Sequence, residues 1–311
     1  MNEQLIASIT KMVVEKLSQE KEEQPPTIDL WKSGPPPNQP LAEADPPEGR
    51  LIPLKPLQAQ PGSGKSVLKS SGQEPDKEGL LNELRKKTPS RIAVGRAGAR
   101  PKTETWLQFR LDHAAAVDAV YGEVPQEVLD RLGFFTVQTR VKDKEEYIRR
   151  PDLGRRLSDE ARELIKRKCH MSPTVQIVIS NGLSAKAIET NVEDVYLSLE
   201  QSLKNLGIQT GTPFYVDKGR VALMDEIGDV LTPEVVIMLI GERPGLVSAE
   251  SLSAYLCYKP RKGVIEADRM VVSNIHKGGI PPVEAGAYLG TLIQKILTYQ
   301  ASGVSLVKKE K

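Results

Sequence analysis

Residues 235–240, a run of apolar side chains rich in valine and isoleucine, constrain the fold of this chain most strongly. Such a run predicts a strand that is buried on both faces, as in parallel sheets covered by helices. Gly241 ends the run, and a carboxylate and a guanidinium, Glu242 and Arg243, follow directly. Because ligands bind outside the carboxyl ends of strands in open α/β sheets, we expect these two side chains to lie at a ligand or partner site.

Strand-like and helix-like segments alternate from about residue 174 onward. The pattern predicts helices at about 192–206, ended by Gly207, and at 221–230, and a last helix opened by Pro281 and Pro282. The predicted strands lie at residues 175–179, 214–216, 235–240, 255–258 and 270–272. Such alternation implies parallel, right-handed βαβ units. The fold class is therefore α/β, with a mostly parallel sheet and flanking helices.

The rest of the chain differs in character. Residues 1–19 carry apolar side chains at helical spacing and predict an amphipathic helix, which docks on a partner or folds back on the main domain. Residues 20–80 hold most of the prolines and predict a disordered linker. Residues 81–170 are expected to form a mainly helical lobe, in which Ser158 caps a helix, and residues 171–303 the α/β domain.

Composition excludes several classes of protein. With 43 basic and 41 acidic residues, the chain gives no reason to expect a nucleic-acid or membrane surface. No apolar run approaches the roughly 18 residues that span a bilayer, and the charged residues near the start predict no secretory signal. Two distant cysteines indicate reduced thiols in a cytoplasmic protein. Three scattered histidines predict no metal site, and no nucleophile–base or carboxylate pair predicts a catalytic centre.

Several polar motifs allow two interpretations. Loops at residues 180–184 and 273–282 follow predicted strands and contain glycine, which lets backbone approach a ligand closely, although ordinary turns have the same composition. Residues 62–66 suggest a phosphate-binding P-loop, but Ala59 stands where that motif requires glycine and no strand precedes it. Arginines within residues 95–101 and 149–156 indicate a protein–protein surface or a solvated face.

Ordered motifs across residues 91–302 closely resemble the small-subunit family of ethanolamine ammonia-lyases. They are Gly95-Arg96-Ala97-Gly98, Arg150-Pro151-Asp152, Ser180-Asn181-Gly182, Gly211-Thr212-Pro213-Phe214, Gly219-Arg220-Val221, Gly241-Glu242-Arg243-Pro244-Gly245, Glu266-Ala267-Asp268-Arg269 and Ser273-Asn274-Ile275-His276. The resemblance implies a Rossmann-like sheet. It also implies a lyase that converts ethanolamine to acetaldehyde and ammonia with adenosylcobalamin, and that is active only with a large TIM-barrel subunit in a hexamer of heterodimers.

The resemblance also implies site residues. The family's cobalamin-associated positions map onto Val221, Glu242 and Val271, and no catalytic residue maps onto this chain. Some members carry cysteine at the third position, so a backbone contact is expected at Val271. His276 lies in a loop similar to one that presents histidine to cobalt in other cobalamin proteins, but Asn274 replaces the aspartate of that loop. Because the family keeps benzimidazole on cobalt, His276 is not expected to be a cobalt ligand.

In this family a short N-terminal helix can direct the enzyme into a bacterial microcompartment. The resemblance therefore implies that residues 1–19 contact a microcompartment shell or its cargo. The competing interpretation is a non-enzymatic scaffold or binding module with a Rossmann-like core. A stand-alone nucleotide-dependent enzyme is disfavoured because no G-x-G-x-x-G motif follows a predicted strand.

Overall fold

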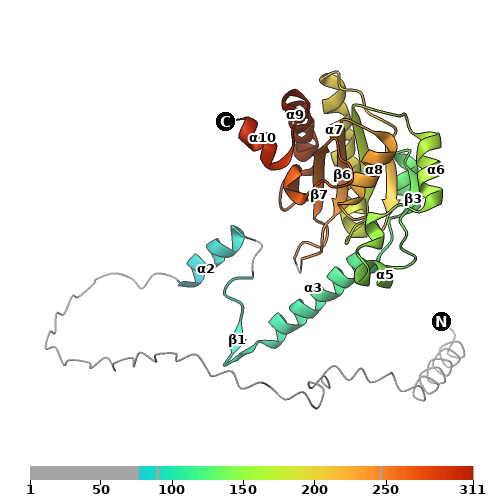
Figure 1. Cartoon of the computed structure of the whole chain (residues 1–311). Coiled ribbons are helices and arrows are strands. Elements are labelled where there is room, and N and C mark those ends of the chain that lie inside the picture. Colours follow the sequence, from blue (N-terminus) through green and yellow to red (C-terminus); the bar gives the residue numbers. More distant parts are fainter. Residues whose placement is uncertain (1–76, 89–90, 246, 311) are drawn as a thin grey trace, which may run out of the picture. The chain divides into compact units, whose positions relative to one another are not determined.

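The computed structural model describes residues 77–88, 91–245 and 247–310, all within one compact unit that spans Ser71–Lys311 (Figure 1). The predicted N-terminal helix, the P-loop-like residues 62–66 and almost all of the predicted linker lie outside the described residues. The helix α2 (Lys77–Lys86) begins inside the range predicted as linker.

A mixed sheet of six strands forms the centre of the described fold, in the order β3-β5-β4-β6-β7-β8. The strands are β3 (Phe135–Gln138), β4 (Val175–Ser180), β5 (Phe214–Asp217), β6 (Val235–Gly241), β7 (Leu252–Tyr258) and β8 (Arg269–Ile275). Strands β3, β5, β4 and β6 pair in parallel, whereas β7 pairs antiparallel with both β6 and β8. The predicted mostly parallel α/β sheet is therefore confirmed, with two antiparallel pairings at one edge.

Helices cover both faces of this sheet (Figure 1). Helices α7 (Ala185–Asn205) and α9 (Pro282–Tyr299) pack on one face, and α6 (Asp159–Lys168) and α8 (Leu223–Leu231) on the other. Along β6, Val235, Ile237 and Leu239 join the first core, while the alternate residues join the second. Because successive side chains of a strand point to opposite faces, a strand apolar at every position requires cover on both sides.

The helix boundaries follow from local chemistry that the sequence carries. Ser158 precedes α6 and its side chain accepts the backbone N–H of Ala161, which confirms the predicted cap. Ser184 caps α7 in the same way by accepting the N–H of Ala187. Gly207 follows α7 with a φ of 69°, the left-handed conformation that glycine adopts most easily, and so confirms the predicted helix end.

The range predicted as a mainly helical lobe also contributes to the sheet. It contains α3 (Thr103–Tyr121), α4 (Gln126–Arg131), α5 (Lys144–Arg149) and the short strands β1 (Arg96–Ala97) and β2 (Arg100–Pro101). It also contains β3, an edge strand that was not predicted. This strand is four residues long and only Val137 is buried, so its sequence lacks a strong apolar pattern.

Two further differences from the predictions concern the C-terminal part. The described residues between β6 and β7 form no helix, and β7 runs antiparallel to β6. A last helix, α10 (Gly303–Lys309), follows the one opened by Pro281 and Pro282. Among the described helices, none combines the length and the apolar character that crossing a membrane requires.

Candidate ligand site at the carboxyl end of the sheet

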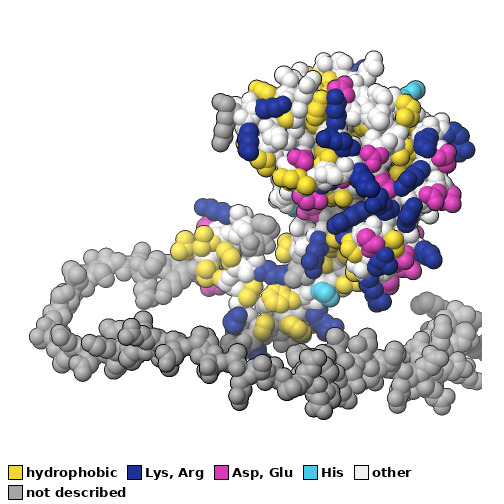
Figure 2. All heavy atoms as spheres, in the orientation of Figure 1, with side chains coloured by type: hydrophobic (Ala, Val, Ile, Leu, Met, Phe, Trp, Pro, Cys, Tyr) yellow, Lys and Arg dark blue, Asp and Glu magenta, His cyan; other side chains and the backbone are white. Residues whose placement is uncertain are grey.

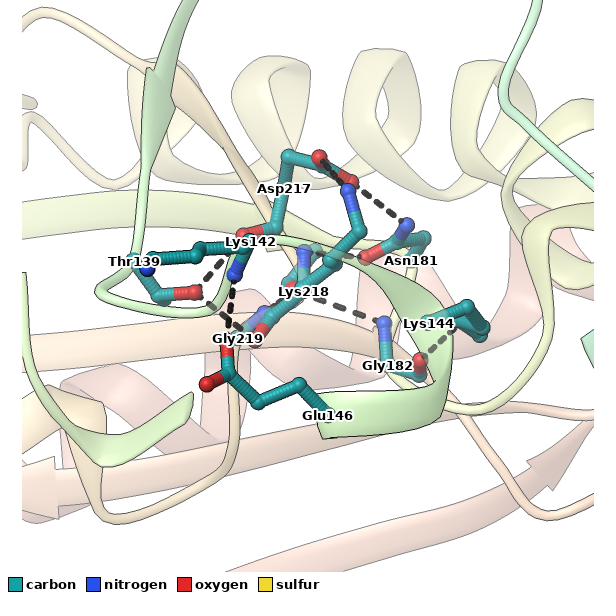
Figure 3. Close-up of polar contacts among 10 residues, drawn as sticks. Thr139, Lys142, Lys144, Glu146, Asn181, Gly182, Asp217, Lys218 and Gly219 are labelled. Carbon is teal, nitrogen blue, oxygen red and sulfur yellow. Dashed lines mark hydrogen bonds and ion pairs between the residues drawn. The ribbon is translucent and has the colours of Figure 1, made fainter. Parts of the chain in front are cut away.

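The loops that follow β4 and β5 leave neighbouring strands toward opposite faces of the sheet. The β4 loop leads to α7 and the β5 loop to α8. From β4 the chain moves to β5 on one side, and from β6 it moves to β7 on the other, so the strand order reverses between β4 and β6, a topological switch point of the kind where ligands bind in open α/β sheets. The β4 and β5 loops lie beside this point. Hydrogen bonds lock the two loops together (Figure 3). The Asn181 amide donates to Asp217 Oδ1 at 2.9 Å and accepts the Lys218 N–H at 2.8 Å. The Gly219 N–H donates to Ser180 Oγ at 3.0 Å.

A cavity of about 440 Å³ opens beside this switch point. Val221 enters it from the loop after β5, Glu242 from the end of β6 and Val271 from β8. The full lining is Tyr147, Gly182, Leu183, Arg220, Val221, Ile240, Gly241, Glu242, Arg243, Ser253, Tyr255, Val271 and Ser273. The three residues singled out from the sequence, far apart along the chain, therefore share one cavity wall.

The Glu242 carboxylate is fixed in place by neighbouring strands. Its Oε2 accepts the Ser251 hydroxyl at 3.1 Å, while Oε1 accepts the Ser253 hydroxyl and, at 3.3 Å, the Asn274 backbone N–H. A carboxylate offers about four acceptor positions, so these three bonds orient Glu242 and leave it able to accept one more. The donors come from β7 and β8, where the strands shift register near Leu252.

Tyr147 lines the same cavity from α5. Its hydroxyl donates to the Gly219 carbonyl at 2.9 Å, and the Arg220 guanidinium lies 4.0 Å from the centre of its ring. Arg220 also donates from Nη2 to the Tyr147 carbonyl at 2.8 Å, while its buried Nε has no hydrogen-bond partner among the described residues. Because this Nε is buried, a ligand in the cavity can be met only by the other N–H groups of Arg220, which lines the cavity. The sequence analysis did not single out Tyr147, because nothing in its local pattern connects α5 with the β5 loop.

Two glycines allow the β4 and β6 loops to approach each other closely. A Cβ atom added at Gly241 would lie 2.1 Å from the Ser184 carbonyl oxygen and 2.4 Å from that of Asn181. One added at Gly182, where φ is +50°, would lie 2.4 Å from the Gly241 oxygen. Backbone therefore forms this part of the cavity wall, as the glycine content of both loops predicts.

Lys144 lies beside the same loops. Its Nζ donates to the Gly182 carbonyl at 3.2 Å (Figure 3). The same atom lies 4.9 Å from the centre of the Tyr147 ring. Burial lowers the pKa of this ammonium from 10.5 to about 8; the nearby Asp217 carboxylate opposes the shift, and Lys218 and Arg220 add to it. The fold therefore disfavours the charged form of Lys144.

We expect Lys144→Met to remove the change of the free energy of unfolding with pH that the titration of Lys144 causes. Between pH 8 and 10.5 the unfolded chain keeps the Lys144 proton that the folded chain has lost, so the free energy of unfolding rises with pH in this window. In urea unfolding from pH 8 to 10, the free energy of unfolding of wild type should therefore rise relative to that of Lys144→Met. Taking this difference cancels the cysteine and tyrosine titrations, because both proteins share them. Lys142→Met, which replaces an exposed lysine of the same loop, is the control. Parallel stability curves for wild type and Lys144→Met would contradict the assignment.

His276 and the arginine clusters lie apart from this cavity. The His276 ring is buried, with Nε2 2.8 Å from Asn274 Oδ1 and Nδ1 accepting the Gly278 N–H at 3.1 Å. Both ring nitrogens of His276 are therefore engaged within the loop. Arg150 forms two hydrogen bonds with Asp152, and Arg156 pairs with Glu226 at 3.1 Å. These two arginines therefore support local structure.

The fold and the cavity define a mixed α/β protein with a six-stranded, mostly parallel sheet, flanking helices and a cavity at the carboxyl end of the sheet. Residues 78–307 match the family model described as ethanolamine ammonia-lyase light chain. The chain belongs to this family. It is 52% identical to the ethanolamine ammonia-lyase small subunit of Clostridium perfringens over 231 residues, which cover 74% of this chain and 78% of that one. It is 50% identical to the protein of the same name from Lachnoclostridium phytofermentans over the same length and shares of each chain.

Proposed function

We propose that this chain is the small subunit of an adenosylcobalamin-dependent ethanolamine ammonia-lyase, and that the cavity at the switch point forms one wall of its cofactor site. One observation carries the proposal: Val221, Glu242 and Val271 line the same cavity, although the resemblance that singles them out contains no information about distance. Family membership supports the rest, since the relatives named above are small subunits of this enzyme.

The residues present fit the edge of a corrin ring. Such an edge carries methyl groups together with amide side chains that both donate and accept hydrogen bonds. Val221, Ile240 and Val271 offer apolar contacts. The remaining acceptor position of Glu242 suits an amide N–H, and Arg220 offers donors to an amide carbonyl. At about 440 Å³ the cavity takes only part of so large a molecule, so most of the cofactor must lie against a second chain.

That second chain is, in our proposal, a TIM-barrel large subunit, with the two assembled as a hexamer of heterodimers. When bound, adenosylcobalamin supplies radical chemistry through cleavage of its cobalt–carbon bond. The proposed task of this chain is to orient the cofactor through Glu242 and Arg220 and to exclude water and side reactants from the enclosed site. The catalytic side chains are assigned to the large subunit.

We expect the purified chain alone to lack activity and to become active with the large subunit. Co-expression of the two, followed by an assay of acetaldehyde and ammonia release from ethanolamine with and without adenosylcobalamin, tests this. Activity should require both chains and the cofactor. The competing scaffold interpretation predicts that the large subunit is equally active without this chain. Turnover by the isolated chain would overturn the assignment as a subunit.

We also propose that residues 1–19 direct the assembled enzyme to a microcompartment in the cytoplasm. These residues precede the part of the chain that matches the family model, which begins at residue 78. Deleting residues 1–19 should leave activity in solution within about twofold of wild type, because an amphipathic tail adds only partner binding. Co-purification with shells should be lost. A large loss of activity in solution would contradict a targeting role.

A further inference from the structure

The helix α3 presents a large apolar face to solvent. Trp106, Leu107, Leu111, Val117 and Tyr121 are 52%, 54%, 65%, 40% and 50% exposed. At about 100° per residue, these five positions fall within about 140° of one another around the helix, an arc that also holds Arg110 and Asp118. Figure 2 shows hydrophobic side chains gathered over α3. Single exposed apolar residues are ordinary, whereas a contiguous stripe marks an interaction surface.

The chain itself covers the opposite side of the same helix. The Arg91 guanidinium lies 4.7 Å from the centre of the Phe109 ring and pairs with Asp112. Near the carboxyl end of α3, Ala116 and Ala119 are buried. One side of α3 is thus packed by its own chain. On its other side, the bare face, the five apolar side chains are exposed, and the Tyr121 hydroxyl donates to Glu145 Oε1 at 2.7 Å.

Positive charge flanks the bare face. Residues 85–110 contain eight Lys or Arg and one acidic residue, Glu104, a net charge of +7. Of these basic residues, Arg96, Arg100, Lys102 and Arg110 are exposed. Figure 2 shows Lys and Arg beside the hydrophobic side chains of this region. The surface therefore complements a partner that combines an apolar groove with an acidic rim.

We propose that the bare face of α3 docks on the large subunit of the enzyme, in an apolar groove bordered by carboxylates. This inference rests on the proposed function, which supplies the partner. The apolar N-terminal segment, residues 1–19, lacks the complementary charge, because it contains two acidic residues, Glu3 and Glu15, and two basic ones, Lys11 and Lys16. A second copy of the chain would bring the same positive charge to the interface.

The test pairs a double variant with a matched control. Leu107→Glu combined with Leu111→Glu places two carboxylates on the bare face, and Val304→Glu places one on an equally exposed site of α10, where Val304 is 51% exposed. The full chain, labelled with a fluorophore, is titrated with the purified large subunit. Because central apolar anchors dominate interface energy, the double variant should bind at least about 100-fold more weakly, and Val304→Glu within about twofold of wild type.

A second pair of substitutions tests the charge argument. Arg96→Glu with Arg100→Glu should slow association by about tenfold at low salt and weaken its salt dependence, because flanking charge mainly affects the rate of encounter. A photo-crosslinking residue at position 111 should attach to the large subunit. This measurement keeps the proposal testable if the double variant fails to fold by circular dichroism.

Each other outcome has a definite meaning. If the wild-type chain and the large subunit do not bind at all, both the proposed function and this docking surface fail. If they bind and the double variant binds equally well, only the docking surface fails. Crosslinking from position 111 to residues 1–76, or to a second copy of the chain, would assign the face to that occupant and overturn the proposal.

Discussion

Gly241→Ala should destabilise the fold by about 3 kcal/mol, at the upper end of the cost of overpacking a close-packed site. The new Cβ would meet the Ser184 and Asn181 carbonyl oxygens at 2.1 and 2.4 Å, so backbone must move. The movement also disturbs the hydrogen bond of 3.0 Å from the Leu183 N–H to the Gly241 carbonyl. Urea unfolding and thermal melting measure the effect, with a fall in Tm of about 10 °C expected for a domain of this size.

Gly245→Ala is the control for this substitution. Gly245 lies in the same loop, and its added Cβ would meet only the Ser248 side-chain oxygen at 3.2 Å, which can rotate away. Its stability should stay within about 0.5 kcal/mol of wild type, as for most surface substitutions. Equal stability of the Gly241→Ala and Gly245→Ala proteins would show that the two loops do not approach as closely as described.

Strong periodic patterns predicted most of the fold, and weak ones did not. Residues 235–240 are apolar at every position, and only a strand covered on both faces satisfies them, as β6 does. The strand β3 was missed because it lies at the edge of the sheet and a single buried valine carries its apolar pattern. The strand β7 runs antiparallel to β6, and the described residues that connect the two strands form no helix. The sequence of this connection did not indicate that the chain reverses there.

The candidate site was predictable only in outline. The predicted topology placed Glu242 at the carboxyl end of a strand, and the family resemblance added Val221 and Val271. Neither the topology nor the resemblance indicates which groups orient the Glu242 carboxylate. Ser251 and Ser253 do so from the start of β7, which begins at Leu252, before the predicted strand at residues 255–258. Hydrogen bonds between side chains on different strands depend on how the strands are aligned, and short sequence motifs do not determine that register.

Glu242→Ala should weaken adenosylcobalamin binding by the assembled enzyme about 10- to 100-fold while leaving ethanolamine affinity nearly unchanged. Hydrogen bonds to charged groups contribute about 1.5–3 kcal/mol, and Glu242 lines the cavity assigned to the cofactor. The substitution also leaves the Ser251 and Ser253 hydroxyls without their acceptor. Spectroscopic titration with the cofactor, followed by substrate titration at saturating cofactor, separates the two affinities.

Two further substitutions sharpen this prediction. Ser253→Ala keeps the carboxylate but removes one of its three donors, so cofactor affinity should fall less than for Glu242→Ala. Glu163→Ala removes a carboxylate on α6 that is 75% exposed and should change neither affinity. Unchanged cofactor binding together with a collapse of ethanolamine binding in Glu242→Ala would reverse the assignment, because the carboxylate would then serve the substrate. A graded loss from Ser253→Ala to Glu242→Ala would instead indicate that the orientation of Glu242, and not its charge alone, holds the cofactor against this subunit.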